Sequence, residues 1–282
     1  MINSMKLIYS LVEMPELPEV ETIKNELSAC IVGKRFYDVK IYDDRPLRRP
    51  SLAEFRLQLI GQRIKKVSRS GKYLLFHLSR NVTFIIHLRM TGALLLNPKN
   101  PEKYTRIIFE FNDNSNLVFT DTRRFGTMYL VKNKQDVIGK LGVEPLSDDF
   151  TPNALAKLLS RRKASIKAVL LDQTVIAGIG NMYADESLFS AKIHPMRDAG
   201  SLSPREINAL HKTIRETLTK AIGSKGASIS TYKRPSGELG TAHLFFRVAH
   251  RGGEPCPRCK ATLQRVKIRN RSSYYCPKCQ KI

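Results

Sequence analysis

Two groups of residues have types and spacings that could do chemistry, and the first stands near the beginning of the chain. Met14, Pro15 and Glu16 come directly before a helical pattern. If translation starts at Met14 and the methionine is removed, Pro15 becomes a secondary amine beside a carboxylate. An α-amino group has a pKa of about 7.7 to 8.0, against about 10.4 for lysine, so far more of it is neutral near pH 7. Such an amine could attack C1′ of a sugar and form an iminium.

The second group is a set of cysteines near the end of the chain. Four of the five cysteines lie in the last 27 residues with the spacing Cys-x2-Cys-x16-Cys-x2-Cys: Cys256, Cys259, Cys276 and Cys279. Two tight turns with this spacing present two pairs of thiolates to one tetrahedral zinc ion. Two disulfides are the alternative, and the lack of other cysteine pairs disfavours it. We therefore predict one structural zinc ion, and we expect Cys30 to be a small core residue.

The elements that must position these residues change in type along the chain. Segments rich in β-branched and aromatic residues, separated by polar turns, predict strands at 36–42, 73–78, 83–87, 106–111 and 117–120. From about residue 145 the pattern becomes helical, with Thr151 as N-cap and Pro152 in the first helical position. The segment from Ser203 to Glu206 is a capping box that opens a helix ending near Gly223. Its predicted core face consists of Ile207, Leu210, Ile214, Leu218 and Ile222.

The cysteine pairs flank a predicted β-hairpin. Its strands are 261–268 and 272–275, and its turn is Arg269, Asn270 and Arg271. We therefore expect a zinc-bound hairpin with arginines at its tip.

Charge narrows the choice of partner. Lysine and arginine number 48 against 25 acidic residues, which gives a formal net charge of +23. Such an excess favours a polyanionic partner, with nucleic acid ahead of an anionic membrane surface. There is no apolar run of about 18 residues, and residues 1–13 make a poor secretory signal. We expect a cytoplasmic, nucleoid-associated protein that does not bind membranes, with a monomer as the default state.

From Met14 to Gln280 the chain resembles the formamidopyrimidine-DNA glycosylases, of the helix–two-turn–helix family that includes endonuclease VIII. The resemblance rests on the following segments: MPELPEVET at 14–22, SGKYL at 70–74, HLRMTG at 87–92, DTRRFG at 121–126, Lys167 with LLDQ at 170–173, AGIGNMYADE at 177–186, and Arg271 with the four cysteines.

The resemblance implies a division of labour among these residues. Pro15 would displace the base and hold the sugar as a Schiff base, and Glu16 would handle protons at the sugar ring. β- and δ-Elimination would then nick the strand on both sides of the lost nucleoside. Lys72 and Arg271 count as catalytic residues, and together with His87 and Asn181 they would grip phosphates around the everted nucleotide.

Further residues would contact the DNA in other ways. Met90, Arg123 and Phe125 match side chains that fill the space left by the everted base. Arg124 is expected to contact DNA as well. Lys167 matches a lysine associated with the handling of oxidised purines.

The implied fold is a multidomain α+β protein with an N-terminal helix and antiparallel β-sandwich, a central helix–two-turn–helix domain and a C-terminal β-hairpin zinc finger. The predicted boundaries are an extension at 1–13, a catalytic sandwich domain at 14–145, a helix–two-turn–helix domain at 146–226, and a lesion-cap loop with the zinc finger at 227–282.

Two departures from the family's pattern bear on function. Residues 1–13 precede the motif, and if retained they would turn the Pro15 nitrogen into a tertiary amide. We therefore expect either that translation starts at Met14 or that the extension is removed. The segment 228–251, where the family closes a cap over the base, matches only loosely, with His250 where glycine is common.

The sequence thus predicts a bifunctional glycosylase and abasic-site lyase that acts on oxidised purines, such as 8-oxoguanine and formamidopyrimidines, in duplex DNA. Three alternatives stay open: an oxidised-pyrimidine glycosylase of the endonuclease VIII type, a non-catalytic zinc protein that binds damaged DNA and keeps its extension, and a basic zinc-ribbon factor on RNA.

Overall fold

The computed structural model describes residues 14–99 and 103–282, so the predicted extension at 1–13 lies outside the described residues. The chain divides into two compact units, Met1–Lys140 with Ser224–His243 and Leu141–Gly223 with Leu244–Ile282, which we call the sandwich unit and the helical unit. Within the described ranges, no helix has both the length and the apolar character that crossing a membrane requires.

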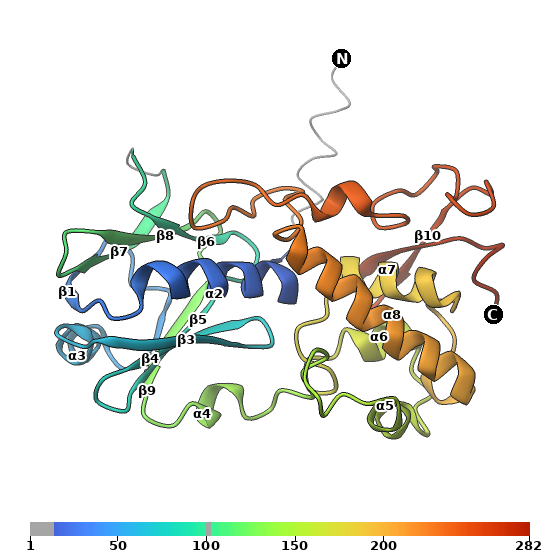
Figure 1. Ribbon diagram of the computed structural model, residues 1–282, viewed down its shortest axis with the longest axis horizontal. Coiled ribbons are helices and arrows are strands. Elements are labelled where there is room, and N and C mark those ends of the chain that lie inside the picture. Colours follow the sequence, from blue (N-terminus) through green and yellow to red (C-terminus); the bar gives the residue numbers. More distant parts are fainter. Residues whose placement is uncertain (1–13, 100–102) are drawn as a thin grey trace, which may run out of the picture. The chain divides into compact units, whose positions relative to one another are not determined.

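The sandwich unit is built from two sheets (Figure 1). The first has the order β1-β7-β8-β6 and contains β1 (Phe36–Ile41), β6 (Gly92–Leu96), β7 (Thr105–Phe111) and β8 (Asn116–Asp121). The second has the order β2-β9-β5-β4-β3 and contains β2 (Leu47–Arg49), β3 (Ile64–Ser70), β4 (Tyr73–Leu78), β5 (Thr83–His87) and β9 (Thr127–Val131). All pairs except β2 with β9 are antiparallel, which confirms the predicted antiparallel sandwich.

One apolar core joins the two sheets to the helices of this unit. Phe84 of β5 lies 5.3 Å from Phe109 of β7, ring centre to ring centre, so the sheets meet through aromatic side chains. Helix α2 (Leu17–Ile31) adds Ile23 and its neighbours to the same core, and α3 (Leu52–Leu59) adds Phe55. A short helix, α4 (Gln135–Ile138), follows the last strand.

The helical unit contains α5 (Pro152–Leu159), α6 (Ile166–Leu170), α7 (Asn181–Ala191), the short 3₁₀ helix η1 (Ala199–Ser201) and α8 (Pro204–Gly223). A second 3₁₀ helix, η2 (Ala242–Phe245), lies where the chain passes from one unit to the other. The hairpin of β10 (Gln264–Ile268) and β11 (Arg271–Tyr275) completes the chain, in red in Figure 1.

The predicted helix signals are confirmed. The Thr151 hydroxyl accepts a hydrogen bond from the Ala154 N–H and caps α5, and α8 begins at Pro204. Of the predicted core face of α8, Leu210, Ile214 and Leu218 are fully buried, whereas Ile207 and Ile222 at its two ends are only partly buried.

Two details of the sequence analysis are wrong. Cys30 is exposed, because the buried face of α2 runs through Ile23, Leu27 and Ile31. The tip of the zinc hairpin is a two-residue turn of Arg269 and Asn270, both with positive φ, so Arg271 already pairs with Ile268 in the ladder.

Candidate functional site

The N-terminus of α2 holds the predicted nucleophile and its carboxylate next to each other. Glu16 is the N-cap of α2, and its side chain accepts a hydrogen bond from the backbone N–H of Glu19. In return the Glu19 carboxylate accepts the Glu16 N–H at 2.8 Å. This reciprocal capping box fixes the Glu16 side chain, which is 1 % exposed, beside Pro15. A carboxylate is stabilised at this place by the positive end of the helix dipole.

The turn that carries Lys72 is tied to the same helix. Lys72 lies between β3 and β4 after Gly71, whose φ of 55° lies in the left-handed region. The guanidinium group of Arg69 donates to the Gly71 carbonyl at 2.8 Å and to the Glu21 carboxylate of α2 at 2.8 Å. Arg69 therefore holds the Lys72 turn in a set position relative to α2.

His87 lies at the end of β5 and close to Lys72. Burial, together with the positive charges of Arg89 and Lys72, lowers the pKa of His87 to about 3. The ring is therefore neutral near pH 7. Its Nδ1 accepts the backbone N–H of Arg89 at 3.0 Å, which leaves the proton on Nε2. The structure thus assigns His87 the form of a neutral donor, suited to a phosphate oxygen.

The three predicted space-filling residues meet in one exposed cluster. The guanidinium group of Arg123 lies 5.0 Å from the centre of the Phe125 ring, and its Nη1 lies 3.3 Å from the Met90 sulfur. Phe125 is 48 % exposed, a large value for an aromatic side chain between two strands. Phe125 is therefore a surface residue and not part of the core.

A buried carboxylate builds the turn that presents this cluster. Asp121, at the end of β8, accepts hydrogen bonds from the Thr91 hydroxyl, the Arg123 N–H and the Gly126 N–H. A Cβ atom at Gly126 would lie 2.6 Å from the Phe119 ring, so only glycine fits there.

Arg124 lies on the same turn in a left-handed conformation, with a φ of 62°. Its Nε lies 3.2 Å from a carboxylate oxygen of Asp43. Arg124 is therefore held by one acidic partner while its side chain stays 41 % exposed.

In the helical unit, Asn181 occupies the first position of α7. Gly180 is the N-cap, and Gly178 has a φ of 89°. The Gln173 side chain accepts the Gly178 N–H and donates to the Ile179 carbonyl, which fixes the turn before the helix. Such a helix start offers backbone N–H groups to an oxyanion.

The environment of Lys167 differs from the one expected of a DNA contact. Its side chain is fully buried, and its Nζ lies 2.7 Å from the Asp185 carboxylate and 3.3 Å from the Ser272 carbonyl. Asp185 also accepts the Ser273 hydroxyl and the Tyr274 N–H. Burial raises the pKa of Asp185 to about 6, while Lys167 opposes this shift. A buried, ion-paired ammonium cannot reach a phosphate, so Lys167 acts on β11, the strand that begins at Arg271.

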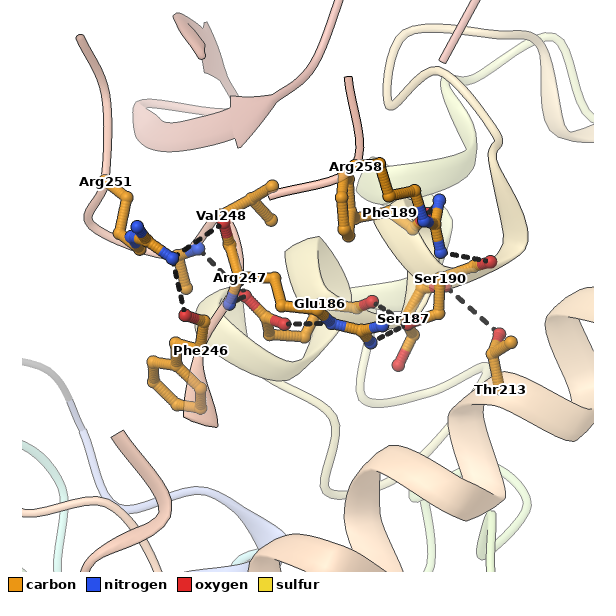
Figure 2. Close-up of polar contacts among 11 residues, drawn as sticks. Glu186, Ser187, Phe189, Ser190, Thr213, Phe246, Arg247, Val248, Arg251 and Arg258 are labelled. Atoms are coloured by element: carbon orange, nitrogen blue, oxygen red, sulfur yellow. Dashed lines mark hydrogen bonds and ion pairs between the residues drawn. The ribbon is translucent and has the colours of Figure 1, made fainter. Parts of the chain in front are cut away.

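A second carboxylate of α7 holds the segment that leads into the zinc hairpin (Figure 2). Glu186 is 3 % exposed and accepts the backbone N–H groups of Arg247, Val248 and Ala249 at 2.8, 2.8 and 3.0 Å. The guanidinium groups of Arg247 and Arg258 lie 5.4 and 4.3 Å from the centre of the Phe189 ring. α7 thus holds β11 of the hairpin through Asp185 and the segment before the hairpin through Glu186.

The four cysteines lie where a metal ion could bind. Their sulfur atoms all lie within 4.8 Å of one another, with Cys256 to Cys279 at 4.0 Å and Cys259 to Cys276 at 3.4 Å. A tetrahedral zinc ion with Zn–S bonds of about 2.3 Å requires sulfur atoms about 3.8 Å apart. The cysteines therefore fit one zinc ion.

The buried acids Glu19, Asp121, Asp185 and Glu186 were missed as functional residues. Asp185 and Glu186 stand in a helix that is buried on every side from Asn181 to Phe189, and this burial is visible only in the structure. Asp121 and Glu19 lie inside the motifs DTRRFG and MPELPEVET, and nothing else in the sequence marks them as functional residues.

Comparisons with known proteins agree over almost the whole chain. Family models match the formamidopyrimidine-DNA glycosylase N-terminal domain at residues 14–128, the H2TH domain of the same enzymes at 141–233, and a zinc finger found in FPG and IleRS at 253–282. A formamidopyrimidine-DNA glycosylase of Pelotomaculum thermopropionicum is 43 % identical over 275 residues, covering 95 % of this chain and all of the relative.

Solved structures match as well. The Lactococcus lactis Fpg bound to abasic-site DNA has a TM-score of 0.88 and 35 % identity, and covers 95 % of this chain and 100 % of its own. The same enzyme bound to Fapy-dG DNA gives 0.87 and 35 % with the same coverage.

Proposed function

The chain belongs to the formamidopyrimidine-DNA glycosylase family, a family of base-excision repair enzymes, and we propose that it excises oxidised purines from duplex DNA through a Schiff base at Pro15. Strand cleavage at the resulting abasic site follows by β- and δ-elimination. The observation that carries the proposal is the capping box, which fixes the buried Glu16 side chain at the start of α2, one residue after Pro15. A free amine next to a fixed proton carrier is what imine formation at a sugar requires.

The neutral Pro15 amine attacks C1′, and the bond from C1′ to the base breaks. The proton that the attacking amine loses ends on the departing base. The ring oxygen leaves C1′ with a proton from Glu16, which gives an iminium. Loss of a C2′ proton then breaks the 3′ C–O bond, a further elimination breaks the 5′ C–O bond, and water releases the free amine.

We propose that each of the two units contacts the DNA with its own residues. In the sandwich unit, Lys72 and the Nε2 of His87 bind phosphates near the reacting sugar. In the helical unit, Asn181 and Arg271 bind phosphates. Arg124 supplies a further positive group.

The exposed cluster of Met90, Arg123 and Phe125 takes the space of the everted nucleotide, with Arg123 meeting the unpaired base. Unstacking costs a few kcal/mol per step, which inserted apolar groups and phosphate contacts offset.

We propose that the protein binds one zinc ion and that the role of this ion is structural. Cys256, Cys259, Cys276 and Cys279 would hold it, and it would fix the base of the hairpin that carries Arg271. No proton or electron passes through it.

We further propose that the protein acts as a monomer in the cytoplasm, on the nucleoid, and that its functional domains are 14–145, 146–226 and 227–282. Of the last domain, residues 227–243 belong to the sandwich unit. The formal charge of +23 supports a DNA partner.

A nicking assay tests this function directly. A chain that begins at Pro15 is incubated with duplexes that contain 8-oxoguanine, thymine glycol or no lesion. Nicking of the 8-oxoguanine strand, with phosphates on both sides of the gap, supports the proposal. Faster cleavage of thymine glycol favours the endonuclease VIII type of activity. Salt-sensitive binding without nicking favours the non-catalytic alternative.

A further inference from the structure

Glu19 has two hydrogen-bonding partners that lie far apart in the sequence. One carboxylate oxygen accepts the N–H of Glu16 at 2.8 Å, and the other accepts the N–H of Ala227 at 2.8 Å. The side chain is 1 % exposed, so water does not weaken these contacts. One buried carboxylate therefore joins the catalytic end of α2 to residue 227, and both lie in the sandwich unit.

Ala227 belongs to the neck of a closed loop, residues 224–243. The Thr241 N–H donates to the Ser224 carbonyl at 2.9 Å, and the Ala242 N–H donates to the Gly226 carbonyl at 2.8 Å. The two sides of the neck are in contact, since a Cβ atom at Gly240 would lie 2.2 Å from the Lys225 carbonyl oxygen. The neck therefore behaves as one piece.

Gly226 fits this neck for two reasons. Its φ is 77°, in the left-handed region, and a Cβ atom there would lie 2.9 Å from a carboxylate oxygen of Glu19. Any larger residue would press on Glu19 from the side of the loop.

The body of the loop is attached elsewhere to the sandwich unit. Tyr232 lies in the apolar core and donates from its hydroxyl to the Lys225 carbonyl. Arg234 pairs with Glu26 of α2 at 2.6 Å. The Thr231 hydroxyl donates to the Met90 carbonyl, within the exposed cluster. The loop thus has contacts at the catalytic end and at the cluster that fills the duplex.

We propose that Glu19 is a positioning residue that couples the neck of the 224–243 loop to Pro15 and Glu16. The inference rests on the proposed function, since it assigns Pro15 and Glu16 the chemistry. A shift of Ala227 moves the Glu19 carboxylate, and the Glu16 N–H follows it. The position of the loop then affects imine formation even when no base is present for the loop to cover.

Preformed abasic DNA separates the effect of the loop on imine formation from any contact of the loop with a base. This DNA has no base at the reacting sugar, so a loop that acts only on the base cannot change the rate. The rate of borohydride-trapped adduct formation is measured with the chain that begins at Pro15 and with its Gly226→Ala variant. Coupling predicts a roughly tenfold slower rate for the variant, from strain in the left-handed region and pressure on Glu19. A rate equal to that of the unsubstituted chain would overturn the proposal.

Gly61→Ala is the matched control. Gly61 has a φ of 79° and open space around its missing Cβ, so the substitution adds similar backbone strain away from Glu19. Its trapping rate should stay within about twofold of the unsubstituted chain. Thermal unfolding of each variant shows whether a rate loss exceeds what destabilisation explains, and Gly61→Ala slowing as much as Gly226→Ala would count against coupling.

A double-mutant cycle that combines Gly226→Ala with Glu19→Gln tests whether the effect of Gly226 passes through Glu19. The Gln amide can accept from one N–H but presents an NH₂ group to the other, so this variant also slows trapping. If Gly226 acts through Glu19, the double variant is no slower than the slower single variant. Additive losses would overturn the proposal. Complete inactivity of the unsubstituted chain on abasic DNA would instead contradict the proposed function.

Discussion

Glu16 shows how a single residue acquires a chemical role from its place in a helix. The side chain caps α2 and the Glu16 N–H is bound in return by Glu19, so the carboxylate is held at the start of the helix. The sequence predicted the pair from the motif, but the reciprocal bonds explain why the carboxylate stays in place.

Replacement of this carboxylate tests its role as a proton carrier. Glu16→Gln keeps a side chain that can accept the Glu19 N–H but removes the group that takes up and releases a proton. We expect excision of 8-oxoguanine to fall by roughly 10² to 10⁴-fold, with little change in DNA affinity. Single-turnover nicking and a binding titration measure the two quantities, and a loss confined to binding would contradict the assignment.

His87 gives a prediction on pH. Its folded pKa of about 3 lies below its unfolded value of about 6.5. The neutral ring therefore contributes stability that is fully present above pH 6.5 and is lost as the pH falls toward 3.

The measurement is the free energy of unfolding in urea at pH 7 and at pH 5, for the natural chain and for His87→Gln. The natural chain should lose more stability over this interval than the variant, since other groups titrate equally in both. Equal losses would show that His87 is not buried in its neutral form.

At the scale of elements, α7 joins the helices to the zinc hairpin through Asp185 and Glu186. Lys167→Met leaves the Asp185 carboxylate buried beside an apolar side chain. We expect a loss of about 3–5 kcal/mol in the free energy of unfolding.

The double variant Lys167→Met with Asp185→Asn removes the stranded charge and should recover part of this loss. Urea unfolding of both variants measures it. A double variant no more stable than the single one would mean that the ion pair does not hold these elements together.

Removal of zinc tests whether the metal holds the hairpin that carries Arg271 in place. We expect one zinc ion per chain, and chelation should abolish nicking because Arg271 loses its support, while most helical circular dichroism remains. Cys276→Ala should lose the metal, whereas Cys30→Ala, at an exposed cysteine outside the cluster, should keep it and stay active. Full activity of a zinc-free chain would contradict the structural role.

The elements also show what the sequence could and could not predict. Strands β4 and β5 were predicted to the residue because nearly all their side chains are apolar, aromatic or β-branched. Strand β3 was missed because it lies at a sheet edge and presents Lys65, Lys66 and Arg69 to solvent or to α2. Propensity alone does not predict a charged edge strand.

Prediction from the sequence is limited in a similar way for the candidate functional site. Its exposed members could be predicted from motifs. The buried carboxylates that position them could not, because their partners are backbone N–H groups distant in the sequence, as with Glu19 and Ala227. The burial of Lys167 was missed for the same reason, since its partner Asp185 stands 18 residues away.

For the whole molecule, the excess of positive charge predicts how binding depends on salt. Lys72 and Arg271 alone should contribute a slope of about −1.8 to a plot of log K against log salt concentration, at ~0.9 per phosphate. We expect a steeper slope, since Arg124 adds to it. Fluorescence anisotropy with undamaged duplex DNA at several salt concentrations measures the slope, and a flat plot would contradict a phosphate-gripping surface.

The most direct test of the account concerns which amine attacks the sugar. The active protein is isolated, its intact mass is determined, and it is then trapped with borohydride on 8-oxoguanine DNA and digested. We predict a mass that begins at Pro15 and a sugar remnant on the peptide that starts with Pro15 and Glu16. A remnant on a lysine, or an active chain that still carries residues 1–13, would contradict the central claim.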